Sequence, residues 1–374
     1  MKKILVITGE ESGDKQFSLF WREISPFLSE DYLLWGIGGN FFTSIGGEVV
    51  FPQENLSVMG VTEVLFRARD ILEAGKRILS HPYLTETSGV VLVDFPDFNF
   101  RIGKLLAGRG YPVIYFIPPK VWAWRRGRIK VMKKFVKLAL LIFPFESELY
   151  SAEGIENIYV GNPAIRYLGK RLKSAARDSV LLLPGSRNFE VEKLLPIMLR
   201  TVKVLDFYGY KLKKKLILAS SVDRTKIVTL LTEAETCGEI VIVDEKNLVE
   251  VLPTGRIAIA ASGTINLELA VAGVPQVVVY RVSPLTFAIG KRFVKLSHVS
   301  PVNIVAGREV VPELLQDECN EKRIVEKVLN FLDNEELVSR VRSGYEEVTG
   351  VLSSGVEPSL IASKVEEIFE KKGR

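Results

Sequence analysis

The chain alternates short apolar segments with longer segments in which apolar residues recur at helical spacing. The short segments predict buried β-strands at residues 3–8, 90–93, 113–116, 140–143, 180–183, 215–219, 240–243, 257–260 and 276–280. Between them, the i, i+3, i+4 pattern predicts helices in residues 61–79 and in parts of residues 190–207 and 265–272. Strands that alternate with helices form βαβ units, so the sequence predicts an α/β fold with parallel sheets.

The strand pattern starts a second time at Val180, after the polar stretch 166–179. A length of 374 residues also favours two domains. We therefore predict two doubly wound domains, residues 1–165 and residues 166–350. The remaining residues, 351–374, are expected to form a C-terminal helix that packs back on the first domain.

Composition narrows the class of protein. Apolar residues make up 47% of the chain and charged residues 25%, as in ordinary globular proteins. Two histidines and two cysteines without a CxxC pair argue against a zinc site, a Ser-His-Asp triad and a disulfide framework, and they fit a reducing cytoplasm. The apolar runs are too short for a signal peptide or a membrane-spanning helix.

The net charge of +5 is concentrated in one basic segment. Its cations are Arg125, Arg126, Arg128, Lys130, Lys133, Lys134 and Lys137. Such a segment attracts nucleic acid, anionic lipid or a phosphorylated substrate, but it is equally typical of a solvated helix face. Just before it, Trp122 and Trp124 suit stacking on a sugar or contact with an anionic headgroup, and a packed loop is the alternative.

Polar residues follow the predicted strands of the first domain, where α/β sheets bind their ligands. The turn 9–14 reads GEESGD, and its carboxylates suit a hydroxyl-bearing ligand better than a phosphate. An acidic helix start would explain them equally well. After strand 90–93 come Asp94, Asp97 and Asn99. A carboxylate at this edge can act as a general base, or it can cap the following helix.

The second domain has a different set of residues after its strands. Arg187 follows a Pro-Gly-Ser turn, and Ser262, Gly263 and Thr264 open a predicted helix. Backbone N–H groups, hydroxyls and an arginine at helix starts favour an anion such as a diphosphate. Glu268 lies one helical turn after Thr264, where its carboxylate could hold ribose hydroxyls. Carboxylates in one domain and anion-binding groups in the other suit transfer from a nucleotide diphosphate to a hydroxyl acceptor.

Together these motifs resemble the lipid-A-disaccharide synthase family. They are GEESGD (9–14), GIGG (36–39), VMGVTEVL (58–65), DFPDFN (94–99), VWAWR (121–125), PFE (144–146), LLPGSR (182–187) with Glu190, ASGT (261–264) with Glu268, and VAGREVVPELLQ (305–316). They occur in order over most of the chain, and their combination is more specific than any one of them.

The resemblance implies a GT-B glycosyltransferase with two Rossmann-like domains facing a cleft. The first domain would bind the acceptor and the second the UDP-sugar. The implied donor is UDP-2,3-diacylglucosamine and the acceptor is 2,3-diacylglucosamine 1-phosphate (lipid X). The products would be the β-1,6-linked lipid A disaccharide 1-phosphate and UDP. The family works at the cytoplasmic face of the inner membrane, on its surface lipid, without a metal, a cofactor or nucleic acid. Formation of a homodimer is possible, and the resemblance does not decide it.

The resemblance also implies roles for the residues. Inversion needs a base on one face of the anomeric carbon, and Asp97 is the expected base, with Asp94 as the alternative. Leaving-group stabilisation is expected from Arg187 and from the helix start at Ser262–Thr264. The full set of expected substrate-binding residues is Glu11, Ser12, Asp94, Asn99, Trp124, Arg125, Arg187, Ser262, Gly263, Thr264, Glu268 and Asn303.

The sequence departs from the family pattern at residues 118–120 (Pro-Pro-Lys), at Asn162 and at residues 301–302. Other functions therefore stay under consideration. A UDP-N-acetylglucosamine 2-epimerase would share the diphosphate site, but such enzymes use histidines, which are scarce here. A non-catalytic nucleotide-sugar-binding protein would not need Asp97. A NAD-dependent oxidoreductase would carry the GxGxxG motif, which the chain lacks.

Overall fold

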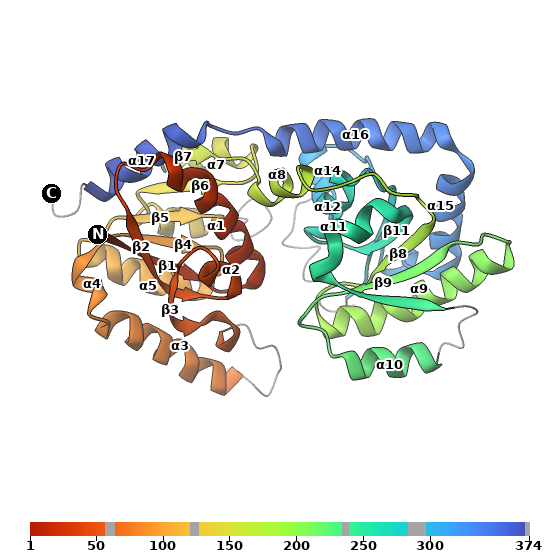
Figure 1. Cartoon of the computed structure of the whole chain (residues 1–374), viewed down its shortest axis with the longest axis horizontal. Coiled ribbons are helices and arrows are strands. Elements are labelled where there is room, and N and C mark those ends of the chain that lie inside the picture. Colours follow the sequence, from red (N-terminus) through yellow and green to blue (C-terminus); the bar gives the residue numbers. More distant parts are fainter. Residues whose placement is uncertain (57–63, 120–126, 234–238, 283–296, 371–374) are drawn as a thin grey trace. The chain divides into compact units, whose positions relative to one another are not determined.

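The computed structural model describes residues 1–56, 64–119, 127–233, 239–282 and 297–370. These residues form two compact units (Figure 1). The first consists of Met1–Ala164 and Leu352–Arg374, and the second of Ile165–Val351. Two helices span the boundaries between them in the sequence: α8 (Pro163–Gly169) and α16 (Glu335–Ser353).

The first unit is built around a parallel sheet of seven strands in the order β3-β2-β1-β4-β5-β6-β7. The strands are β1 (Lys2–Thr8), β2 (Tyr32–Gly38), β3 (Glu48–Pro52), β4 (Thr87–Val93), β5 (Val113–Phe116), β6 (Leu138–Leu141) and β7 (Asn157–Tyr159). The helices are α1 (Glu11–Ile24), α2 (Asn40–Thr43), α3 (Val64–Ser80), α4 (Tyr83–Glu86), α5 (Pro96–Gly108), α6 (Gly127–Met132), α7 (Glu146–Ala152) and α17 (Pro358–Glu370), with 3₁₀ turns at Ser25–Phe27 and Gln53–Asn55.

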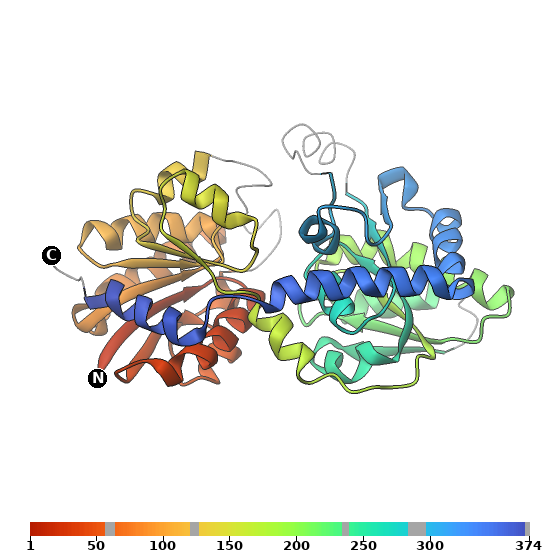
Figure 2. The ribbon, with the colours of Figure 1, turned by 90° about the horizontal axis from the view of Figure 1, so that it is seen from above.

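Both faces of this sheet are covered by helices (Figures 1 and 2). Every described strand pair is parallel, so the strands are buried on both sides and read as nearly continuous apolar runs. Leu5, Ile7 and Leu92 belong to one core together with residues of α3 and α5. The helices α1 and α17 contact the sheet at β4.

The second unit has a parallel sheet of six strands in the order β10-β9-β8-β11-β12-β13. The strands are β8 (Ser179–Leu183), β9 (Lys213–Leu218), β10 (Ile240–Asp244), β11 (Gly255–Ala261), β12 (Gln276–Tyr280) and β13 (Glu313–Leu315). The helices are α9 (Asn188–Phe207), α10 (Arg224–Glu233), α11 (Leu248–Val251), α12 (Ile265–Val271), α14 (Pro301–Ala306), α15 (Glu321–Asp333) and most of α16, with 3₁₀ turns at Glu245–Asn247, Leu252–Thr254 and Gln316–Glu318.

Each sheet reverses its direction of winding once. The reversal lies between β1 and β4 in the first sheet and between β8 and β11 in the second. In such sheets the loops on either side of the reversal diverge, and the crevice between them is where ligands bind. The register places Thr8 beside Val93 and Leu183 beside Ala260, so the strands on either side of each reversal end nearly level.

Candidate active site

The loop between β4 and α5 has an unusual backbone. Asp94 and Phe95 both have positive φ, at 43° and 46°. Consecutive left-handed residues other than glycine are rare, and the surrounding structure must hold them. Pro96 then starts α5 with its fixed φ, and Asp97 lies in the first turn of the helix.

Two buried side chains hold this loop through one backbone atom. The amide nitrogen of Asn99 donates to the carbonyl oxygens of Asp94 at 2.8 Å and Val93 at 3.2 Å. The hydroxyl of Tyr115, on β5, donates to the same Asp94 oxygen at 2.7 Å. Burial raises the pKa of Tyr115 well above its usual value, which keeps the hydroxyl protonated as a donor.

Asn99 is therefore placed differently from the expected substrate contact. Its side chain is fully buried and its amide is directed at the backbone of its own loop. The reason is geometric, because a helix that begins at Pro96 turns residue 99 back toward the strand it follows. We describe Asn99 as a residue that supports the loop.

The β1–α1 turn lies against the same loop. A Cβ atom on Gly9 would come within 2.0 Å of the Phe95 ring, so only glycine allows this approach. Glu11 and Ser12, in the first turn of α1, are exposed. The first unit thus brings Glu11, Ser12, Asp94 and Asp97 to the loops on either side of its winding reversal.

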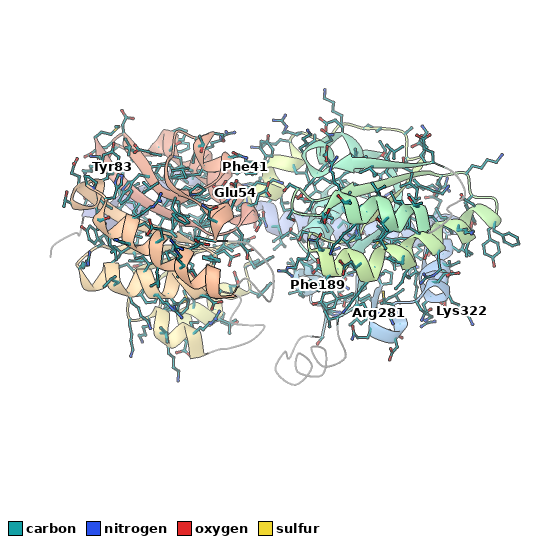
Figure 3. All side chains as sticks on the ribbon, turned by 90° about the horizontal axis from the view of Figure 1, so that it is seen from below. Phe41, Glu54, Tyr83, Phe189, Arg281 and Lys322 are labelled. Carbon is teal, nitrogen blue, oxygen red and sulfur yellow. The ribbon has the colours of Figure 1, made fainter. Side chains whose placement is uncertain are left out.

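Asp14, the last residue of the GEESGD turn, does not face solvent. Its carboxylate accepts hydrogen bonds from the backbone N–H groups of Phe41 at 3.0 Å and Phe42 at 3.2 Å, at the start of α2 (Phe41 is labelled in Figure 3). Burial raises the pKa of Asp14 above its usual value. One of the carboxylates in this turn is therefore structural, and it binds the start of α2 rather than a ligand.

Asp97 is accessible and paired. Its side chain is 79% exposed, and its Oδ1 accepts a hydrogen bond from Nη2 of Arg128 at 2.8 Å. Arg128 belongs to α6 in the basic segment and is only 20% exposed. Trp124 and Arg125, the two other expected ligands of this unit, lie outside the described residues.

In the second unit, Arg187 follows a tight turn after β8. Gly185 has a φ of 112°, and a Cβ atom there would lie 2.5 Å from a carboxylate oxygen of Glu190. Glu190 is buried in the first turn of α9, and Nη1 of Arg187 lies 3.3 Å from its other oxygen. The Arg187 side chain remains 46% exposed. The exposed Phe189 beside it is labelled in Figure 3.

Two polar groups of the β11–α12 turn form hydrogen bonds within the protein. The hydroxyl of Ser262 donates to the Val299 carbonyl at 2.8 Å, and the N–H of Gly263 donates to Asn266 Oδ1 at 2.9 Å. Thr264 is exposed at the N-cap of α12, and Glu268 is partly exposed one turn later. Ser262 and Gly263 thus shape the turn, while Thr264 is open to a ligand.

A buried amide network that was not predicted from the sequence supports this turn. Asn266 donates to the Ala261 carbonyl and to Gln276, and Gln276 donates to the Asn266 carbonyl and to Tyr345. All three side chains are almost completely buried. The sequence signal was an asparagine in α12 and a glutamine in β12 among mostly apolar residues. Amide side chains at buried positions are normally fully hydrogen-bonded, so a network was to be expected there.

Asn303 is also placed differently from the expected ligand contact. It is fully buried, donates to the Val311 carbonyl and to Glu313, and accepts from the N–H groups of Val310 and Val311. Four internal hydrogen bonds satisfy the amide, so the side chain fixes the loop between α14 and β13.

The two units therefore offer different chemistry. At the first, an exposed carboxylate follows β4, where it can accept a proton. At the second, a partly exposed arginine and a threonine follow β8 and β11, where they can hold an anion. Within the residues that the structure describes, no helix has both the length and the apolar character that a membrane span requires.

Solved structures with similar folds define the class. A Staphylococcus aureus MnaA structure with UDP matches with a TM-score of 0.66 and 13% identity, covering 99% of this chain and 98% of its own. The calicheamicin glycosyltransferase matches with a TM-score of 0.58 and 14% identity over the full length of both chains. Two parallel α/β units with these likenesses define a GT-B fold, as the resemblance implied.

Comparison of sequences identifies the family more narrowly than comparison of folds. The model of the lipid-A-disaccharide synthetase family matches residues 4–355, so the chain belongs to that family. The lipid-A-disaccharide synthase of Geobacter metallireducens is 34% identical, over 99% of this chain and 98% of the relative. That of Myxococcus xanthus is 37% identical over 87% of each. The chain is thus a hexosyltransferase of lipid A biosynthesis that takes a nucleotide-sugar donor and a lipid acceptor, and the predicted family is confirmed.

Proposed function

We propose that the enzyme transfers 2,3-diacylglucosamine from its UDP conjugate to the 6-hydroxyl of 2,3-diacylglucosamine 1-phosphate, with inversion at the anomeric carbon. The oxygen of the acceptor attacks this carbon, and the bond to the diphosphate breaks. The electron pair leaves with UDP, and the hydroxyl proton passes to a base. The observation that carries the proposal is an exposed carboxylate, Asp97, at the winding reversal of the first sheet.

Asp97 is proposed as the base in preference to Asp94. A general base must reach the hydroxyl that it deprotonates. The Asp97 side chain is 79% exposed in the first turn of α5. Asp94 is only partly exposed, and the hydrogen bonds to its carbonyl fix it within the loop. Glu11, Ser12 and Asp94 are assigned to the acceptor sugar, with Trp124 and Arg125 retained as predicted ligands.

The second unit is proposed to hold the UDP group. Arg187 and the start of α12 at Thr264 would stabilise the diphosphate as its negative charge develops. Glu268 would hold the ribose hydroxyls. Glu190 supports this assignment, because its buried carboxylate lies beside the Arg187 guanidinium and restricts where it can point.

The place of action is proposed to be the cytoplasmic surface of the inner membrane. Both proposed substrates carry acyl chains that reside in a bilayer. Exposed cations on and after α6, namely Lys130, Lys133, Lys134 and Lys137, would favour an anionic lipid surface. Co-sedimentation with anionic vesicles, compared with neutral ones, tests this contact.

The reaction is tested by measuring UDP release from UDP-2,3-diacylglucosamine with and without lipid X. The proposal predicts acceptor-dependent UDP release and a disaccharide phosphate in the mass spectrum. Asp97→Asn should reduce turnover by about 10²-fold or more, as expected for loss of a general base, and should leave UDP binding nearly unchanged. Equal turnover in this variant would reject Asp97 as the base.

A further inference from the structure

The segment 297–300 of the second unit is joined to the turn at which the diphosphate is proposed to bind. These residues form neither helix nor strand, and they lead directly into α14. The Val299 carbonyl accepts a hydrogen bond from the hydroxyl of Ser262 at 2.8 Å. Ser262 is the first residue after β11, so a side chain that fixes Val299 also fixes the start of the β11–α12 turn.

One carboxylate, that of Glu313 on β13, holds this segment. Its Oε2 accepts the N–H of Val299 at 2.9 Å, and its Oε1 accepts the N–H of Ser300 at 2.8 Å. Oε1 also accepts from the side-chain amide of Asn303 at 2.8 Å. Ser300 and Asn303 are fully buried. Loss of the carboxylate would therefore leave donors without a partner where water does not reach them easily.

The groups around Glu313 require a carboxylate rather than an amide. Asn303 cannot turn its own amide round, because its oxygen already accepts the N–H groups of Val310 at 2.7 Å and Val311 at 3.0 Å. Three donors thus face the Glu313 side chain, two from the backbone and one from Asn303. A carboxylate accepts at both oxygens, whereas a glutamine would place an NH2 group against one of these donors.

We propose that Glu313 is a positioning residue for the nucleotide-sugar donor. Through Val299 and Ser262 it holds the β11–α12 turn in the conformation that binds the diphosphate. A turn that is ordered in advance binds more tightly, because less conformational entropy is lost when the ligand arrives. The inference rests on the proposed function, in which this turn holds the UDP group, and it assigns Glu313 no direct contact with the ligand.

Arg177 provides a matched control at the other end of the same strand and helix. Its guanidinium donates to the carbonyls of Gly255 at 3.1 Å, Gly273 at 3.0 Å and Ala272 at 2.8 Å. Gly255 begins β11, and Ala272 and Gly273 follow α12. Arg177 thus makes three hydrogen bonds to the backbone of the same unit, but none of them leads to Ser262.

The test measures the Kd of UDP by isothermal titration calorimetry, at a temperature at which each variant is folded. UDP should bind to Glu313→Gln about tenfold more weakly than to the wild type, because Val299 loses its support and the turn is no longer ordered in advance. The KM for the UDP-sugar should rise by a similar factor, while kcat and the KM for lipid X stay unchanged. Arg177→Met should lower Tm at least as much and keep the wild-type Kd.

Ser262→Ala interrupts the same connection from the other side and leaves the hydrogen bonds of Glu313 intact. It should also weaken UDP binding by about tenfold. Adding Glu313→Gln to Ser262→Ala should then weaken binding by less than about threefold more, because two residues that act through one connection are not additive.

A wild-type Kd for UDP in Glu313→Gln or in Ser262→Ala would overturn the inference. So would a double variant in which the two factors multiply, or an equal loss of affinity in Arg177→Met, which would trace the effect to stability alone. Failure of the proposed function would be seen in other measurements. Gly263→Ala would then bind UDP like the wild type, or the wild type would form no disaccharide from the UDP-sugar and lipid X.

Discussion

The carbonyl oxygen of Asp94 accepts two hydrogen bonds from buried side chains, Tyr115 and Asn99. Neither residue faces solvent. Both hold a backbone with two successive left-handed residues, and that backbone sets where α5 begins. The position of Asp97 in the first turn of α5 therefore depends on two fully buried residues.

Tyr115→Phe tests this dependence. Loss of one hydrogen bond to a buried carbonyl should lower the free energy of unfolding by about 1–2 kcal/mol. Displacement of Asp97 should also lower kcat by about tenfold or more, with little change in UDP affinity. Steady-state kinetics and chemical denaturation measure the two effects.

Tyr111→Phe is the matched control for this variant. The Tyr111 hydroxyl donates to the Leu84 carbonyl at 2.8 Å, within the same unit but at the other end of α5. It should lose similar stability and keep its kcat. An equal loss of kcat in both variants would show that Tyr115 acts only through stability.

Two glycines differ in the space around them, and one of them lies where the diphosphate is proposed to bind. A Cβ atom at Gly263 would meet nothing within 4 Å, whereas one at Gly185 would meet Glu190 at 2.5 Å on a backbone with φ of 112°. Gly263→Ala should therefore raise KM for the donor by about tenfold, because the methyl group occupies the space proposed for the diphosphate, with little change in Tm. Gly185→Ala should lower Tm by several degrees. A Gly263→Ala enzyme with wild-type kinetics would move the diphosphate elsewhere.

The sequence was sufficient to predict which residue types follow the strands, but not the direction in which each side chain points. Asp97, Arg187 and Thr264 are exposed to some degree where ligands were expected. Asn99 and Asn303 instead hold loops, because an asparagine amide satisfies backbone groups as readily as it binds a sugar. Only the backbone path decides between these two uses, and a single sequence does not give that path.

At the scale of elements, the central strands were predicted and several others were not. β1, β4, β5, β8 and β11 are apolar runs buried on both faces, and these give the clearest signal. β3, β7 and β13 are short edge strands without such runs. β2 was not among the predicted strands, and Gly36, with a φ of 140°, interrupts its apolar pattern. A Cβ atom there would meet the Val6 carbonyl at 2.1 Å, so close packing against β1 requires the glycine.

The helix α17 belongs to the first unit although it lies at the end of the sequence (Figure 2). Its Phe369 is 3% exposed and packs on Gly89 of β4. Phe369→Ala should lower the free energy of unfolding of this unit by about 3–4 kcal/mol, the usual cost of removing a buried phenyl group. Leu360→Ala, on the same helix but 62% exposed, should change it by less than about 0.5 kcal/mol. Denaturant titration measures both, and equal effects would argue against this docking.

At the scale of the whole molecule, the alternation of strand and helix was sufficient to predict two parallel α/β units. The proposed division of labour between them, acceptor in the first and donor in the second, is a separate claim. It rests on the kinds of side chain at the two winding reversals, with carboxylates in one unit and anion-binding groups in the other.

Hydrogen exchange can test that division. UDP should slow amide exchange around residues 185–190 and 262–268 of the second unit. Lipid X should slow exchange around residues 9–14 and 94–99 of the first. Bound ligands protect the amides that they contact or stabilise. Protection of residues 94–99 by UDP alone would reverse the assignment.

The most direct measurement of the central claim is the anomeric configuration of the product. The enzyme should convert the α-linked donor and lipid X to a disaccharide phosphate, and the proton at the new linkage should show the large NMR coupling of a β-glycoside. That result would establish both the reaction and inversion by a single displacement. An α linkage, or UDP release without any disaccharide, would contradict the account.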